Sequence, residues 1–152
     1  MTDAADNPYL RDAVMTATPE QLHLMLYDGA IRYALQARDA ILREDYETSF
    51  DRLTRAQNIV SEMQSALNYD INRELCERVA SVYGFLYHKL VDANVQRDVN
   101  AIDDALKVLR IERETWQLLV DKVNRVQQGP AGDSQNDADQ AQEAPAAFSA
   151  EG

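Results

Sequence analysis

Two histidines and one partial motif are the first residues to consider for metal chemistry. A di-iron carboxylate site in a helix bundle needs two Glu-x-x-His motifs together with two further inward glutamates. Glu20 and His23 form that motif once, whereas His88, the other histidine, has Phe85 three residues before it. One motif cannot complete the ligand set, so we expect no metal centre. His23 then fits the commoner role of a surface or half-buried histidine in the first turn of a helix.

A single cysteine, Cys76, limits the thiol chemistry of the chain. No intramolecular disulfide can form, and no thiol cluster exists to bind a metal. Cys76 flanks an apolar stripe through Leu75 and Val79, where we expect a small buried hydrophobic residue rather than a nucleophile. The sequence also lacks a glycine-rich phosphate loop and a Gly-x-Ser-x-Gly elbow. We therefore expect no catalytic residues and no cofactor, and predict that the protein is not an enzyme.

The charge distribution argues against nucleic acid and membranes as partners. The 152 residues carry a net charge of −11, and every Lys and Arg lies at or before Arg125. Residues 127–152 hold five of the 26 acids and no base, so the first 126 residues keep 15 bases against 21 acids. Neither part carries the basic surface that nucleic acid or an anionic membrane requires. The sequence shows no signal peptide and no run of apolar residues long enough to span a membrane, which predicts a soluble cytoplasmic protein.

Four long segments show the three-to-four-residue apolar spacing of amphipathic helices. Their predicted N-caps are Thr18, Asp45, Asn72 and Asp98, and Pro19 with Gln21 strengthens the first. The predicted core stripe of the second helix comprises Phe50, Leu53, Ala56, Val60, Met63 and Leu67. Short connections between long helices force antiparallel neighbours. We therefore predict an all-α protein in which residues 18–126 form an antiparallel up-down four-helix bundle.

The two ends of the chain lie outside this predicted bundle. Residues 1–17 are too short for a fifth long helix, but the apolar residues at 7–10 and 14–15 offer a cap segment that could dock on the bundle. Residues 127–152 are rich in Gln, Asp, Ala, Gly and Ser. Such a composition cannot bury enough apolar surface to offset the entropy of ordering, so we predict an acidic disordered tail.

The first long helix carries more apolar surface than a four-helix bundle requires. Its core stripe is predicted to be Leu22, Leu26, Ala30, Tyr33, Ala37 and Ile41. A second apolar face, almost opposite, is predicted to hold Leu24, Tyr27, Ile31, Leu35 and Leu42. The third helix is widened in the same way by Ala80, Tyr83, Tyr87 and Val91. Mid-helix glycines at 29 and 84 each cost about 1 kcal/mol relative to alanine, which predicts a close approach by another helix.

Three explanations of this second face remain open from periodicity alone. It could pack as ordinary core against the N-terminal segment, form the seam of a homodimer, or provide a groove for an amphipathic helix of a partner. The seven tyrosines, against three phenylalanines, lean slightly towards an interface, because tyrosine combines apolar area with a polar end.

Several sequence blocks, taken together, resemble a known family. In chain order they are Asn7-Pro8-Tyr9, Thr18-Pro19-Glu20-Gln21-Leu22, Met25-Leu26-Tyr27-Asp28-Gly29-Ala30-Ile31, Ala56-Gln57-Asn58-Ile59-Val60-Ser61-Glu62-Met63, Leu90-Val91-Asp92-Ala93-Asn94 and Trp116. Over about residues 7–122 the chain is similar to the flagellin-specific export chaperones, the FliS family. The resemblance implies a cytoplasmic helix bundle that binds the disordered C-terminal segment of newly made flagellin and prevents premature polymerisation. It also implies docking of the loaded chaperone on the cytoplasmic domain of the flagellar export gate.

The resemblance carries a set of partner-binding residues onto this sequence. They are Asn7, Pro8 and Tyr9 of the N-terminal motif, Tyr27, Asp28, Gly29 and Ile31 of the first long helix, and Ile59 and Val60 of the second. From the second face we add Leu24 and Leu35, and from the third helix Tyr83. Residues 7–15 are further predicted to act as a removable lid. Two departures from the family pattern, the turn at 68–72 and Gly84, leave the local contacts there unassigned.

Overall fold

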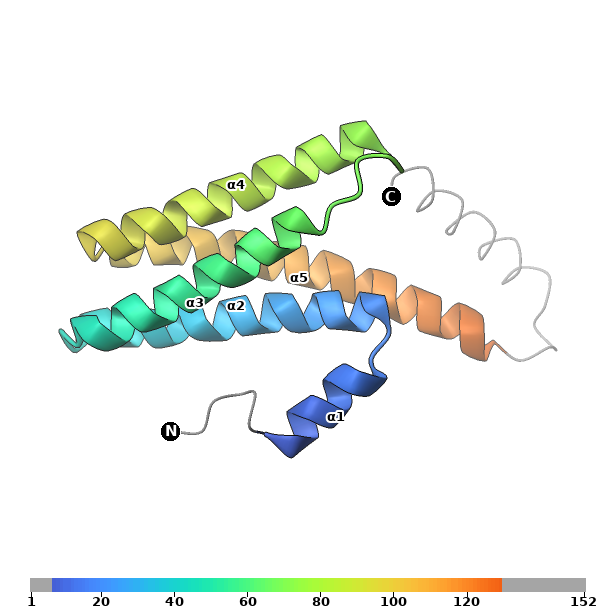
Figure 1. The fold of residues 1–152 in the computed structure, drawn as a ribbon, viewed down its shortest axis with the longest axis horizontal. Helices are drawn as coiled ribbons and strands as arrows, with labels where there is room; N and C mark the ends of the chain where they lie inside the picture. Colours follow the sequence, from blue (N-terminus) through green and yellow to red (C-terminus); the bar gives the residue numbers. More distant parts are fainter. Residues whose placement is uncertain (1–6, 130–152) are drawn as a thin grey trace.

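A computed structural model describes residues 7–129 and is built from five α-helices (Figure 1). The helices are α1 (Pro8–Thr16), α2 (Pro19–Leu42), α3 (Tyr46–Ser65), α4 (Arg73–Gln96) and α5 (Val99–Gln128). Within residues 7–129 there is no β-strand, and none of the helices there is long and apolar enough to cross a membrane. The prediction of an all-α protein is therefore confirmed.

The predicted N-caps begin the four long helices. Thr18 Oγ1 accepts a hydrogen bond from the Gln21 amide at 3.2 Å, and Gln21 Oε1 accepts one from the Thr18 amide at 3.0 Å, so the capping box is complete. Asp45, Asn72 and Asp98 accept from backbone amides two or three residues ahead, at 3.2, 3.0 and 2.9 Å. Each cap satisfies an amide that has no partner inside its helix, and so fixes where the helix starts.

The four long helices form a closed ring in which each packs against two neighbours. Helix α2 packs against α3 and α5, and α4 packs against the same two helices (Figure 1). Short connections between helices 20 to 30 residues long make sequential neighbours antiparallel, which confirms the predicted up-down bundle.

The core is asymmetric in side-chain size. Helix α2 contributes mostly alanines, and the facing helices supply the larger residues: Leu53, Val60, Met63, Leu86, Leu90, Ile102 and Leu109. Small residues on one helix let the others approach closely and fill the space. The core stripe predicted for α3 is correct from Leu53 to Met63 but wrong at Phe50, which is 61% exposed. Phe50 lies three residues before Leu53, and the helical rotation over those three residues places it on the solvent side.

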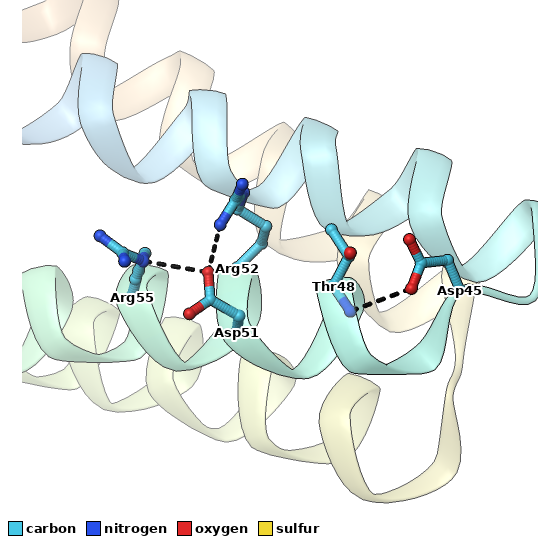
Figure 2. A network of polar contacts seen from close by, with 5 residues as sticks. All are labelled: Asp45, Thr48, Asp51, Arg52 and Arg55. Atoms are coloured by element: carbon cyan, nitrogen blue, oxygen red, sulfur yellow. Dashed lines mark hydrogen bonds and ion pairs between the residues drawn. The ribbon is translucent and has the colours of Figure 1, made fainter. Parts of the chain in front are cut away.

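Polar contacts organise the first half of α3, as Figure 2 shows. The Asp45 cap holds the Thr48 amide, and two turns further on Asp51 receives both Arg52 and Arg55. Arg55 Nε lies 3.0 Å from Asp51 Oδ2. The side chain of Arg52 is only 16% exposed, because it lies against α2 (Figure 2). Asp51 thereby compensates the positive charge of Arg52, which lies on α3 close to the interface with α2.

The N-terminal segment folds but does not dock. Asn7 caps α1 by accepting from the amides of Tyr9 and Leu10, and Pro8 occupies the first helical position. Helix α1 has no buried residue, and Tyr9 and Met15 are 85% and 80% exposed, so the expected packing of this segment on the bundle is not seen. A nine-residue helix has too little apolar surface to hold a fixed position by itself.

The predicted boundary at residue 126 falls two residues short, because α5 continues to Gln128. The predicted disorder of the rest of the tail, and residues 1–6 of the cap segment, lie outside the described residues.

Candidate functional site

A buried chain of polar groups joins α2 to α4 across the bundle. The hydroxyl of Tyr83 lies 3.1 Å from the hydroxyl of Tyr27 and 3.1 Å from Nε2 of His23. Tyr27 is 2% exposed and Tyr83 1% exposed. If Tyr27 donates to Tyr83, and Tyr83 donates to a neutral His23 ring, all three groups are satisfied. Burial is the main cause that raises the pKa of both tyrosines, so both stay protonated at neutral pH.

The same cluster extends to α5. The Trp116 indole nitrogen donates to the backbone oxygen of Glu20 at 2.7 Å, and the His23 and Trp116 rings lie 4.4 Å apart. Burial lowers the pKa of His23 and raises the pKa of Glu112, a carboxylate close enough to raise the pKa of both tyrosines as well. Residues 7–129 contain no group of three potential metal ligands. The hydrogen bonds of Tyr27, Tyr83 and Trp116 join α2, α4 and α5 to one another, and His23 is half-buried, one of the two placements predicted for it.

Tyr27 was expected on the second face of the first helix, and that placement is wrong. The core stripe of α2 is Tyr27, Ala30, Ala34, Ala37 and Ile41, all 8% exposed or less. The helix is thus rotated by a fraction of a turn from the predicted orientation, because the Tyr27 hydroxyl finds a partner inside the bundle. Leu26 and Tyr33, expected in the core stripe, are only partly buried.

The rest of the second face survives as a stripe beside α5. The residues at 24, 28, 31, 35, 38 and 42 follow one another in steps of four and three, so they share one side of α2. Two of them reach α5: Asp28 forms an ion pair with Arg113, and Arg38 Nε lies 2.7 Å from Asp103 Oδ1. Between these two ion pairs, the apolar side chains of Ile31 and Leu35 lie on the α5 side of α2.

The facing side of α5 is basic. Lys107 and Arg110 lie between Asp103 and Arg113, within one or two turns of each, and both are exposed. Among the described residues neither of them takes part in an ion pair, in contrast to Arg113 and Arg38. We call the surface formed by Leu24, Asp28, Ile31, Leu35 and Arg38 of α2 with Asp103, Lys107, Arg110 and Arg113 of α5 the α2–α5 seam.

The seam offers a partner apolar side chains with charge around them. Leu35 is 41% exposed, whereas Leu24 and Ile31 are partly buried and Ile31 also packs against the core. Both ion pairs are partly exposed, with side-chain exposures between 37% and 45%, so solvent screens them and each contributes little to the stability of the bundle. Their more definite effect is to hold the seam in one register.

The other predicted site residues separate into two groups. Val60, Tyr83 and Gly29 are buried, which leaves none of them accessible to a partner in this conformation. Gly29 is a true close-approach glycine, since an added Cβ would lie 3.2 Å from Cδ1 of the partly buried Ile59. Asn7, Pro8 and Tyr9, the N-cap and first two residues of α1, are exposed.

Sequence reasoning missed the seam's cations and two other exposed apolar positions. The ion pairs join residues 65 and 85 positions apart, which periodicity cannot detect. Ile111 and Leu118, 54% and 64% exposed, lie on the outer side of α5, seven residues apart. That spacing was a usable signal. Gly84, unlike Gly29, has open space where a Cβ would be.

Comparison with known proteins places this arrangement in a family. The family model for flagellar protein FliS matches residues 1–123. The flagellar secretion chaperone FliS of Bacillus subtilis is 32% identical, over 85% of this chain and 98% of the relative. That of Salmonella typhimurium is 28% identical, over 76% of this chain and 86% of its own length.

A solved structure supports the same fold. The crystal structure of a flagellar chaperone from bacteria superposes with a TM-score of 0.64 at 19% identity, covering 74% of this chain and 92% of that one. At this identity the likeness bears on the fold alone, while the sequence matches extend over most of the chain. The chain therefore belongs to the FliS family, whose relatives named above are flagellar secretion chaperones.

Proposed function

We propose that this protein is a cytoplasmic export chaperone that binds the C-terminal segment of flagellin along the α2–α5 seam. By binding it, the chaperone prevents premature polymerisation and aids delivery to the flagellar type III secretion apparatus, where the loaded chaperone docks on the export gate. The observation that carries the proposal is the partly exposed apolar stripe of α2, held beside α5 by ion pairs at Asp28 and Arg38.

The physical requirements of a disordered client favour a surface of this kind. A segment that folds as it binds has to offset several kcal/mol of ordering, mainly through apolar burial. An amphipathic helix supplies apolar side chains every three or four residues, which matches the spacing of Leu24, Ile31 and Leu35. The core of the bundle is already filled, so a bound segment adds to the protein without displacing a buried residue.

The exposed α1 helix supplies a second contact in this proposal. Tyr9 keeps 85% of its surface in solvent while the Asn7 cap and Pro8 hold it on a formed helix. The aromatic ring is therefore available to a client or to the seam. Because α1 has no buried residue here, the proposed lid role requires a second client-free conformation, in which α1 covers apolar surface of the bundle and leaves it on binding. Equal hydrogen-exchange protection of residues 8–16 with and without flagellin would exclude the lid.

The test is the affinity for flagellin of a variant at the most accessible seam position. Leu35→Asp places a charge on a side chain that is 41% exposed, so the fold should persist and the Kd should rise at least tenfold. Ile31→Asp is less informative, because Ile31 also packs against the core and its loss can unfold the bundle. Phe50→Asp on α3 and Val95→Asp on α4 are matched controls, since both side chains are more exposed than Leu35 and neither lies on α2 or α5. Equal Kd values for all three variants would rule out the seam.

A homodimer seam is the competing assignment of the same surface. Sedimentation of the purified protein, alone and with flagellin, separates the two. A monomer that forms a one-to-one complex supports the chaperone proposal, and a dimer that Leu35→Asp dissociates without effect on flagellin binding supports self-association.

A further inference from the structure

The C-terminal segment has a chemistry that the bundle lacks. Residues 130–152 carry five acids, no base and one aromatic side chain, Phe148. The match to the family model ends at residue 123, so this segment is a feature of this chain beyond the shared fold. It is acidic over its first fourteen positions, through Glu143, and apolar from Ala144 to Phe148.

The seam carries the complementary chemistry. Lys107 and Arg110 are exposed cations with no ion pair among the described residues, and Glu114, one turn after Arg110, is not paired with it. Ile31 and Leu35 lie on α2 between Asp28 and Arg38, and Lys107 and Arg110 lie on α5 between the ion-pair partners of those two residues, Asp103 and Arg113. The two acids that do lie on the seam, Asp28 and Asp103, are already neutralised by arginines. An acidic segment would meet two available positive charges there.

The position and length of the segment allow it to return to the seam. Trp116 of α5 bonds to Glu20 near the start of α2, and α5 then continues for twelve residues to Gln128 (Figure 1). From Gln128 back to Arg110 is about 27 Å along the helix axis at 1.5 Å per residue. Asp139 lies eleven residues past Gln128, so a fully extended chain lets it reach up to about 36 Å from Gln128. Phe148 lies twenty residues past Gln128, and a flexible chain of that length spans about 25 Å on average. The acids can therefore reach Arg110, and the aromatic ring can reach the apolar stripe.

We propose that residues 130–152 fold back along the α2–α5 seam and occupy it in the absence of a client. Asp137, Asp139 and Glu143 pair with Lys107 and Arg110, and Phe148 covers Ile31 and Leu35. The segment thereby acts as a tethered competitor of an amphipathic client. This competition rests on the proposed function, whereas the contact between the segment and the seam does not. Tethering keeps a weak contact populated, because the local concentration of the segment is in the millimolar range.

Photo-crosslinking of the full-length protein tests the contact without a client. Benzoylphenylalanine at position 148 should crosslink within one chain to residues 24–38 or 103–117. Lys107→Glu with Arg110→Glu should reduce the yield severalfold, as should 0.5 M NaCl, because the pairing is exposed and screened. Arg78→Glu is the matched control, an exposed arginine on α4 that should leave the yield unchanged. Crosslinks that form elsewhere, or only between chains, would overturn the proposal.

Flagellin binding tests the consequence. A triple variant, Asp137→Asn with Asp139→Asn and Glu143→Gln, should lower the Kd for flagellin about fivefold. Loss of a few exposed ion pairs should weaken the binding of the competing segment by about that factor. Added flagellin should also abolish the crosslink. Flagellin binding that Leu35→Asp weakens, with no crosslink on the seam, refutes the fold-back and leaves the proposed function intact. A seam crosslink that saturating flagellin does not displace refutes the client site and leaves the fold-back contact intact.

Discussion

Removal of the Tyr83 hydroxyl should destabilise the bundle more than removal of the Tyr27 hydroxyl. Tyr83→Phe keeps the ring and its packing, so the only loss is one oxygen. That oxygen is shared, because it lies 3.1 Å from both the Tyr27 hydroxyl and His23 Nε2. Tyr27→Phe leaves Tyr83 bonded to His23, whereas Tyr83→Phe leaves two groups without that partner.

The magnitudes follow from burial. The Tyr27 hydroxyl belongs to a side chain that is 2% exposed, and a buried donor left unpaired costs about 1–3 kcal/mol. His23 is only partly buried and water can replace part of its lost bond. We therefore expect Tyr83→Phe to lower the free energy of unfolding by about 2–3 kcal/mol and Tyr27→Phe by about 1 kcal/mol. The double variant should cost no more than Tyr83→Phe, because it also removes the unpaired Tyr27 hydroxyl, which gives a coupling energy of at least about 1 kcal/mol.

Urea unfolding at neutral pH measures all four proteins of this cycle. Unchanged slopes with shifted midpoints would show that only stability has changed. If Tyr27→Phe costs as much as Tyr83→Phe, or if the two effects simply add, the hydroxyls do not share one hydrogen-bonded chain and the described contact of Tyr27 on α2 with Tyr83 on α4 is wrong.

Two further predictions test the two mid-helix glycines and the half-buried His23. Gly84→Ala should raise the free energy of unfolding by about 1 kcal/mol, because the new Cβ meets open space. Gly29→Ala should raise it by less, because its Cβ would press on Ile59. Thermal unfolding of the two variants compares these effects. Burial lowers the pKa of His23, so the unfolded chain binds its proton more readily, and stability should fall as the pH drops below about 6.5. His23→Gln should flatten that dependence in urea unfolding between pH 7.5 and 5.5. The comparison should be made in the Glu112→Gln background. Burial raises the pKa of the Glu112 carboxyl group, so this group would otherwise stabilise the fold as the pH falls and oppose the effect of His23.

Local signals explain why the bundle could be predicted from the sequence. A cap such as Thr18 or Asn72 acts within three residues, and its side chain reveals the start of a helix without knowledge of the fold. Long helices joined by short connections then leave little choice of topology. The buried state of Cys76 followed from the same periodicity.

The orientation of each helix was harder to predict. Helical spacing identifies a stripe but does not rank two competing stripes, and in α2 both were apolar. The decision rests on Tyr27, whose hydroxyl is acceptable in the core only because Tyr83 presents a partner from a helix 56 residues away. The prediction for Phe50 was wrong for the opposite reason: its apolarity suggested burial, but it lies off the buried stripe of α3, on the solvent side.

The candidate site was predicted in part. Leu24, Ile31 and Leu35 were identified as surplus apolar surface, and the structure places them on one side of α2 beside α5. The charged residues of the seam were not identified. Contacts such as the pairing of Arg38 with Asp103 depend on which helix packs beside α2. Long-range charge contacts of that kind become predictable only once the fold is known.

Hydrogen exchange of the full-length protein with and without flagellin tests the central claim most directly. If flagellin binds along the α2–α5 seam, amides in residues 24–38 and 103–117 should gain protection, and those in α3 should change little. Protection confined to α3 and α4, with the seam unchanged at saturating flagellin, would contradict the account.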